Sequence, residues 1–142
     1  MNKIKPKFGL VVDVCVFNKN GEILLIKRKN EPFKDFWALP GGFIEKTELV
    51  DMTALRELKE ETGITKIKLY RIGVFDDPKR DPRGRIISLA YWGRITGRMG
   101  KAGSDAKKFK WFSLKKLPKL GFDHKKIIAT AIKMKYEVRS RK

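Results

Sequence analysis

The segment that decides the fold spans residues 42–64 and reads GFIEKTELVDMTALRELKEETGI. It begins with a glycine and continues into a helical pattern that is far more acidic than its surroundings. Between residues 45 and 61 it carries six acidic and three basic side chains, a net charge of −3, whereas the whole 142-residue chain has a formal charge of +18. This local reversal of charge indicates that the acidic side chains have a task of their own.

The same segment predicts where the helix begins and ends. Thr47 is placed to cap the N-terminus through its side-chain oxygen, and Gly63 is placed to end the helix in a left-handed conformation. One buried face is expected from the apolar residues between these ends, which are Leu49, Val50, Met52, Ala54, Leu55 and Leu58.

Three glutamates project from one side of this predicted helix. Glu57, Glu60 and Glu61 are separated by three and four residues, so they share a face. Glu57 and Glu61 repel each other, while Arg56 is spaced to pair with Glu60 and to recover part of that cost. Converging carboxylates suit a hard divalent cation, which prefers oxygen ligands. The alternative is a solvated acidic face without a ligand.

A family resemblance rests on the fixed positions of this segment, which are Gly42, Glu48, Arg56, Glu57, Leu58, Glu60, Glu61, Gly63 and Ile64. Their spacing resembles the Nudix box at every fixed position. The resemblance implies one Nudix domain over residues 1–142, folded as an α/β/α sandwich with a mixed β-sheet between helices. It also implies hydrolysis of a nucleoside diphosphate linked to another group, with Mg²⁺ or Mn²⁺ as cofactor.

The resemblance further assigns roles to residues of the box. Glu57 and Glu61 are the expected metal ligands, with Glu60 in the same cluster. A backbone carbonyl at Gly41 or Gly42 is expected to complete the metal shell.

Residues around these ligands have less specific expected roles. Glu48 is expected to support the site, and Arg56 to orient a carboxylate by a charge-assisted hydrogen bond. The general base is either a box glutamate or a carboxylate from elsewhere. Asp105 is the first choice outside the box, because its loop faces the metal site in relatives, although it equally fits a turn residue. The other candidates are Asp76, Asp77 and Asp81.

Two further stretches resemble the ADP-ribose pyrophosphatases and their regulator relatives: FDDPKRDPRGRIISLAYWG at residues 75–93 and GFDHKKII at residues 121–128. They imply the reaction ADP-ribose + water → AMP + ribose 5-phosphate. Arg83 and Arg85 are candidates to bind the diphosphate or terminal ribose, or are solvated loop charges. His124 either contacts substrate or packs beside the last helix.

Aromatic residues precede the box in the loop NEPFKDFWALPGG. Phe36 and Trp37 are candidates to stack on a nucleobase. Trp37 equally fits a role in the core beside the helix.

Strands are expected at residues 8–17, 22–29, 66–76, 86–96 and 108–114, from their apolar and β-branched content. Asn18 to Gly21 form the turn of a hairpin between the first two. An amphipathic helix is expected at residues 123–138, with Asp123 as its N-cap. Cys15, the single cysteine, is expected to be a small buried hydrophobic residue.

The charge and composition of the chain limit the classes of partner that we expect. No apolar run approaches the ~18 residues of a membrane span, and a cytoplasmic enzyme is expected. The excess of positive charge favours anionic partners, foremost a nucleotide. Nucleic acid is the less favoured partner, although residues 107–142 hold 13 Lys and Arg against two acids. A homodimer is expected from relatives. The alternative functions are hydrolysis of another nucleotide (a nucleotide sugar, a dinucleotide or an oxidised nucleoside triphosphate) and a nucleotide-sensing, nucleic-acid-binding regulator.

Overall fold

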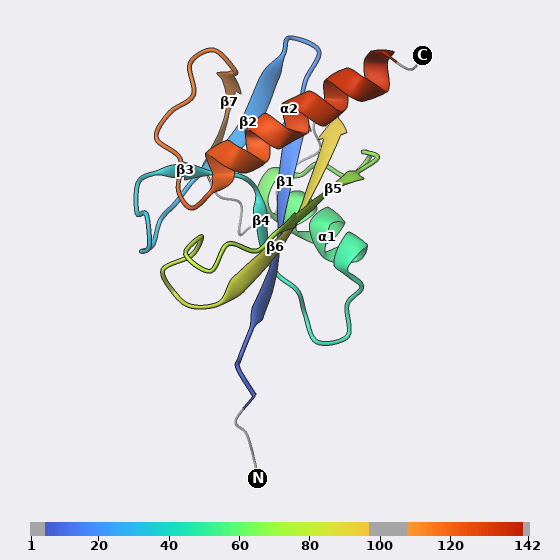
Figure 1. The fold of residues 1–142 in the computed structure, drawn as a ribbon. Helices are drawn as coiled ribbons and strands as arrows, with labels where there is room; N and C mark the ends of the chain where they lie inside the picture. Colours follow the sequence, from blue (N-terminus) through green and yellow to red (C-terminus); the bar gives the residue numbers. More distant parts are fainter. Residues whose placement is uncertain (1–4, 97–107, 141–142) are drawn as a thin grey trace.

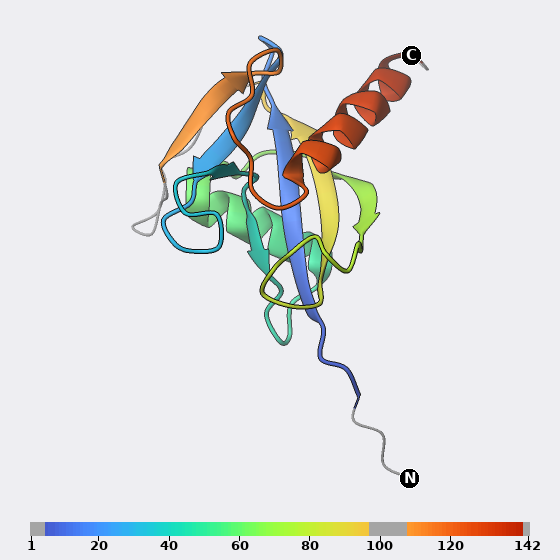
Figure 2. The same ribbon diagram turned by 60° about the vertical axis from the view of Figure 1, so that its left-hand side comes forward.

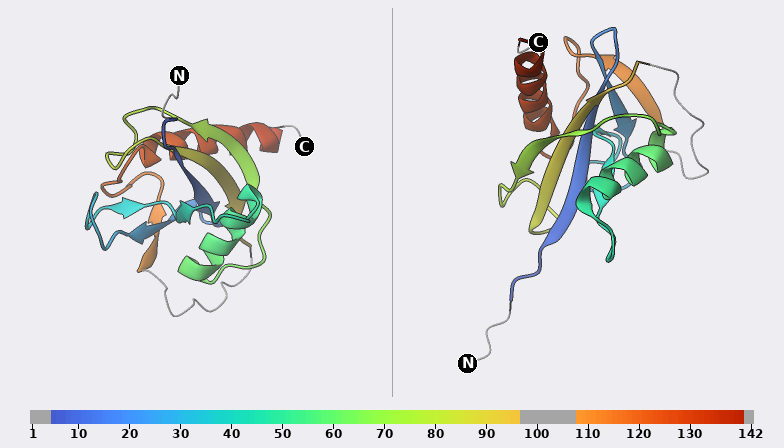
Figure 3. Two further views of the ribbon diagram at one scale, coloured as in Figure 1. Left: turned by 90° about the horizontal axis from the view of Figure 1, so that it is seen from below. Right: turned by 90° about the vertical axis from the view of Figure 1, so that its right-hand side faces the viewer.

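Two helices cover opposite faces of one mixed sheet (Figures 1 and 3). The computed structural model describes residues 5–96 and 108–140 of the chain, with side chains described as far as residue 135. Helix α1 (Val50–Thr62) lies on one face and helix α2 (His124–Ser140) on the other. The expected α/β/α sandwich is confirmed.

The sheet has seven strands in the order β3-β2-β1-β6-β5, with β4 paired to β1 and β7 paired to β2. Strands β1 and β6 run parallel, while the other pairs are antiparallel. The strands are β1 (Gly9–Phe17), β2 (Glu22–Lys27), β3 (Trp37–Ala38), β4 (Gly41–Phe43), β5 (Tyr70–Phe75), β6 (Ile86–Arg94) and β7 (Phe109–Ser113). The turned view shows β1 running through the middle of the molecule (Figure 2).

Strand β1 supplies side chains to two cores because its successive residues point to opposite faces. Val12, Val14 and Val16 pack in the cluster that contains Ala54 and Leu58 of α1. Cys15 and Phe17 pack in the cluster that contains Ile127, Ile128 and Ala131 of α2. Cys15 is fully buried, as expected, and burial raises the pKa of its thiol.

The start of α1 differs from the prediction. Leu49, not Thr47, occupies the N-cap position, and no side chain caps the helix by a hydrogen bond. Instead, Glu48 accepts hydrogen bonds from the Glu45 N–H and the Thr53 hydroxyl, 3.2 and 2.7 Å away. The end is as predicted, because Gly63 has φ 79° and donates to the Lys59 carbonyl.

The predicted apolar face of α1 is only partly right. Ala54 and Leu58 are buried, but Leu49, Met52 and Leu55 are 70%, 58% and 42% exposed. The reason is that the sheet covers a single stripe of the helix, which the exposed residues do not share. No helix in the described parts of the chain is long and apolar enough to cross a membrane.

The remaining elements lie close to their expected positions. Strand β5 begins at Tyr70, later than expected, and β2 ends at Lys27. Asp123 directly precedes α2, and its carboxylate accepts hydrogen bonds from the Arg80 guanidinium, the shortest being 2.9 Å. This bond ties the start of α2 to the loop before β6.

Candidate active site

Two glutamates of α1 face the glycines of β4. The Gly41 N–H donates to Oε1 of Glu61 over 2.8 Å. A Cβ atom at Gly42 would lie 2.5 Å from Oε1 of Glu57, so this carboxylate rests directly against the glycine backbone. Only glycine leaves room for so close an approach. The glycines and glutamates predicted to form the site are therefore brought together.

Arg56 connects the acidic residues around this junction. Its guanidinium donates to both carboxylate oxygens of Glu48, at 2.6 and 3.0 Å. It also donates to Glu57 at 3.0 Å and to Glu60 at 3.2 Å. The Arg56 hydrogen bond lowers the pKa of Glu48 to about 2, with a further contribution from Thr53. These bonds place Arg56 and Glu48 beside the other carboxylates, and their orienting and supporting roles stay predictions.

The donor set suits a hard divalent cation, since it consists of carboxylate oxygens. Glu57 and Glu61 are held against the β4 backbone, while Glu60 is more exposed and bonded to Arg56. Among the described side chains, no three His, Cys, Asp or Glu residues are already grouped closely enough to hold a metal ion. The guanidinium of Arg56 lies beside Glu57 and Glu60 and partly compensates their negative charge.

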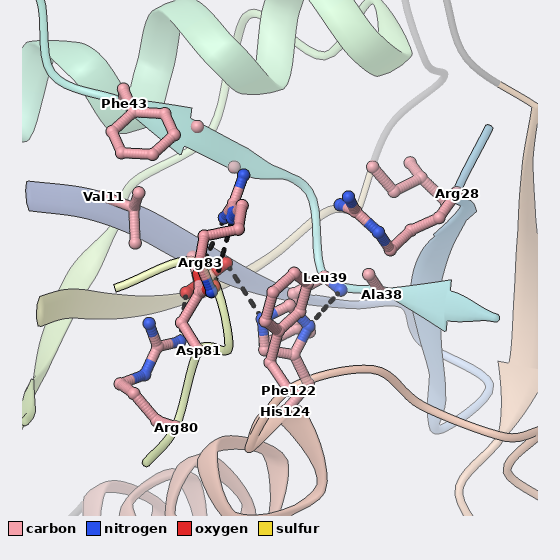
Figure 4. Close-up of a pocket in the computed structure, with 14 residues that line it drawn as sticks. Val11, Arg28, Ala38, Leu39, Phe43, Arg80, Asp81, Arg83, Phe122 and His124 are labelled. Atoms are coloured by element: carbon pink, nitrogen blue, oxygen red, sulfur yellow. Dashed lines mark hydrogen bonds and ion pairs between the residues drawn. The ribbon is translucent and has the colours of Figure 1, made fainter. Parts of the chain in front are cut away.

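A cavity of about 210 Å³ opens beside the two glycines (Figure 4). It is formed by segments far apart in the chain, which supply charged and aromatic side chains to its wall. The lining residues are Val11, Asp13, Ile26, Arg28, Ala38, Leu39, Gly41, Gly42, Phe43, Arg80, Asp81, Arg83, Phe122 and His124. Because Gly41 and Gly42 line this cavity and also contact Glu61 and Glu57, the cavity adjoins the acidic helix at these two glycines.

A buried polar group forms the floor of the cavity. Asp13, 6% exposed, accepts a hydrogen bond from Ser88 and lies 3.2 Å from Nε2 of His124. The Leu39 N–H donates to Nδ1 of His124 over 3.0 Å, so the neutral imidazole carries its proton on Nε2. Burial works against ionisation of Asp13, but His124, Ser88 and Arg80 outweigh it and hold the pKa of Asp13 below its ordinary value.

Arg80 joins this floor to the start of α2. Its side chain is 2% exposed, pairs with Asp123, and lies 3.5 Å from Asp13. It also donates to the Ile86 carbonyl over 3.2 Å. The residues before β6 are thereby anchored, which places Asp81 and Arg83 in the cavity wall.

The sequence-based substrate candidates fall in different places. Arg83 lines the cavity and pairs with Asp81 at 2.7 Å, and His124 lies in its floor. Arg85 lies outside this cavity and donates to the Asp76 carbonyl. Of the proposed bases, Asp81 reaches the cavity. Burial would raise its pKa, but its bonds with Arg83 outweigh this and lower it.

The loop aromatics lie outside the cavity wall. Trp37 is packed against the core on the α2 side, with its ring 4.7 Å from that of Phe112. Phe36 is half-buried and contacts Phe33, at 5.6 Å between ring centroids. Asp105, the first choice for a base outside the box, lies outside the described residues.

Sequence reasoning missed Asp13 and Arg80. Asp13 had a detectable signal, because a carboxylate inside the apolar run LVVDVCVF is costly to bury unless it is paired. Arg80 had none, since it resembles any other charge in a polar loop.

The family model for the NUDIX domain matches residues 7–131, most of the chain and all of the site just described. The chain belongs to the NUDIX family. It is 50% identical over 121 residues to an ADP-ribose pyrophosphatase from Methanocaldococcus jannaschii, covering 84% of this chain and 71% of that protein. It is 33% identical to an ADPR responsive transcriptional repressor from Acinetobacter baylyi, covering 89% of this chain but only 54% of the repressor.

Solved structures show the same fold. A MutT/nudix family protein from Enterococcus faecalis superposes with a TM-score of 0.83 at 32% identity, over 96% of this chain and 65% of that one. The NUDIX domain of NrtR from Shewanella oneidensis, in a cocrystal with ADP ribose, superposes with a TM-score of 0.81 at 29% identity. That alignment covers 92% of this chain and 90% of the domain.

Proposed function

We propose that this NUDIX protein is a divalent-metal-dependent pyrophosphohydrolase that cleaves ADP-ribose into AMP and ribose 5-phosphate. The observation that carries the proposal is the position of Glu57 and Glu61 against Gly42 and Gly41, at the edge of the cavity. This arrangement places carboxylates suited to a metal beside a space suited to a substrate group. The substrate is supported by the relative from Methanocaldococcus jannaschii, whose name is ADP-ribose pyrophosphatase.

The metal would be held by Glu57 and Glu61, with Glu60 in the same cluster and a carbonyl of Gly41 or Gly42. When bound, Mg²⁺ or Mn²⁺ supplies charge neutralisation at the diphosphate and lowers the pKa of a bound water. The Gly41 N–H orients the Glu61 carboxylate for this role. Arg56 holds Glu48 in place and donates hydrogen bonds to Glu57 and Glu60.

The test is turnover of a substrate panel with AMP as the monitored product. We expect the highest kcat/KM for ADP-ribose, complete loss of activity with EDTA, and recovery on addition of Mg²⁺ or Mn²⁺. Preferred cleavage of nucleotide sugars, dinucleotides or nucleoside triphosphates would be consistent with a hydrolase but would contradict ADP-ribose as its substrate. Activity that survives exhaustive chelation would contradict the proposed requirement for a divalent metal ion.

A regulator that senses ADP-ribose is the second candidate, favoured by the similarity to the Acinetobacter baylyi repressor. This reading requires tight ADP-ribose binding without turnover, together with DNA binding that weakens steeply with salt. The expected homodimer and cytoplasmic location remain predictions. Light scattering on the purified protein gives its molar mass and so tests whether it is a homodimer.

A further inference from the structure

The carboxylates of the cavity already have cationic partners. Asp81 is 2.7 Å from the Arg83 guanidinium. Asp13 lies 3.5 Å from the cationic Arg80 guanidinium, and Nε2 of His124 lies 3.2 Å away as a hydrogen-bonding neighbour. Their charges are therefore compensated within the wall, and neither calls for a cation from outside.

Arg28 is bonded differently from the other arginines of the wall. Its Nε donates to the Pro32 carbonyl over 2.7 Å, and one terminal nitrogen donates to the Asn30 carbonyl over 3.4 Å. Within residues 5–96 and 108–135, no carboxylate lies within ion-pairing distance of its guanidinium. Within the part of the chain that the structure describes, these carbonyls account for two of the five N–H donors of the guanidinium, so the others can reach a ligand in the cavity.

The ring of Phe122 lies beside the guanidinium groups of both Arg28 and Arg83. The Arg28 guanidinium carbon lies 4.9 Å from the centre of the Phe122 ring, and that of Arg83 lies 5.4 Å from the same centre. Figure 4 shows these three side chains at one cavity, supplied by different segments. Phe122 has φ 55°, a left-handed conformation that a bulky residue adopts only when its surroundings impose it.

Asp81 compensates the charge of Arg83 over 2.7 Å. Arg28 has no such carboxylate contact among the described residues, so an anion in the cavity would gain an attraction to it that the wall does not already satisfy. Burial lowers the pKa of Arg28, and the positive charge of Arg83 adds to this shift, while nearby carboxylates oppose it. A phosphate oxygen pair matches the fork of a guanidinium, and a charge-assisted bidentate contact of this kind is the strongest hydrogen-bonding arrangement that arginine makes.

We propose that Arg28 binds a phosphate group of the substrate through its guanidinium fork in this cavity, with Phe122 orienting it beside Arg83. The inference rests on the proposed function for the identity of the substrate. The phosphate belongs either to the adenosine half or to the ribose 5-phosphate half, and the same contact serves both.

The test measures binding of the two products, AMP and ribose 5-phosphate, and of inorganic pyrophosphate, by calorimetry without turnover. We expect Arg28→Gln to weaken binding of pyrophosphate and of at least one product by ~10-fold or more. The product whose binding affinity falls most in Arg28→Gln identifies the half of the substrate that Arg28 holds. Lys29→Gln is the matched control, because it removes the same charge from the neighbouring, exposed position. It should change each affinity by less than ~2-fold.

Arg28→Lys keeps the positive charge but removes the planar pair of guanidinium donors, since lysine binds phosphate as a point charge. We expect affinities at least ~3-fold weaker than those of the unmodified protein. If Arg28→Gln fails to fold by circular dichroism, this variant decides. Binding of all three ligands within ~2-fold of the unmodified protein, in whichever variant folds, overturns the proposal.

Turnover separates the two proposals. If the unmodified protein binds phosphates through Arg28 but does not hydrolyse ADP-ribose, the inference stands and the proposed function fails. If ADP-ribose is hydrolysed with an unchanged KM in Arg28→Gln, the function stands and the inference fails.

Discussion

Replacement of Gly42 by alanine tests whether the position of Glu57 is what makes the site work. The added Cβ would lie 2.5 Å from Oε1, 2.6 Å from Cδ and 2.9 Å from Oε2 of Glu57, whereas ordinary contact begins at 3.4 Å. The carboxylate must therefore retreat by about 1 Å, and a misplacement of that size can lower a rate by ~10²-fold. The clash is with the end of a flexible side chain, so the fold should tolerate it.

The assay compares kcat for ADP-ribose with the melting temperature of the same preparation. Gly42→Ala should lose ~10²-fold in kcat while its melting temperature stays close to that of the unmodified protein. Gly41→Ala is the structural comparison, because its Cβ would lie 1.9 Å from the Val12 carbonyl oxygen, a backbone atom that cannot move aside. That variant should unfold at a clearly lower temperature. Full activity in Gly42→Ala would refute the reasoning, because the carboxylate would then be dispensable at this position.

Further predictions concern charge. Glu61→Gln should lower kcat by at least ~10²-fold with an unchanged circular dichroism spectrum, and near-normal turnover would remove Glu61 from the metal site. The pKa of Glu48 is about 2 in the folded chain against an ordinary 4.5, so its pairing stabilises the fold fully above pH 4.5 and is lost as the pH falls towards 2. In Arg56→Gln, carboxyl NMR should show this pKa returning towards 4.5. Arg80→Met breaks a buried pair and should cost about 3–5 kcal/mol in urea unfolding. Arg71→Met breaks an exposed one and should cost less than about 1 kcal/mol. Equal losses would show that burial of Arg80 does not matter.

Much of the fold could be predicted because its signals are local. The apolar strand at residues 8–17 corresponds to β1 (Gly9–Phe17), and the Asn20-Gly21 turn leads into β2. The position of Gly63 fixed the end of α1. The cap was misplaced because the Glu48 side chain bonds to Glu45 and Thr53, which propensities for single residues do not include.

The cavity was harder to predict because its parts are far apart in the chain. For Trp37, stacking on a nucleobase and packing in the core were equally plausible, and only the structure shows that it packs against Phe112 and lies outside the cavity wall. Arg83 and Arg85 are two residues apart, yet one lines the cavity and the other does not. A sequence pattern does not distinguish such neighbours, because their side chains leave the same loop in different directions.

The sequence alone determined that this chain has a helix with Arg56, Glu57, Glu60 and Glu61 at fixed spacing after a pair of glycines. Helical periodicity is a property of consecutive residues, so it is readable without a structure. Only the tertiary structure decided what the rest of the site contains. The bonds of its floor join residues 43 positions apart (Arg80 to Asp123), 75 apart (Asp13 to Ser88) and 85 apart (Leu39 to His124). Such partners are chosen by the pairing of β1 with β6 and by the docking of α2, because buried polar groups must find their hydrogen bonds wherever the folded chain supplies them.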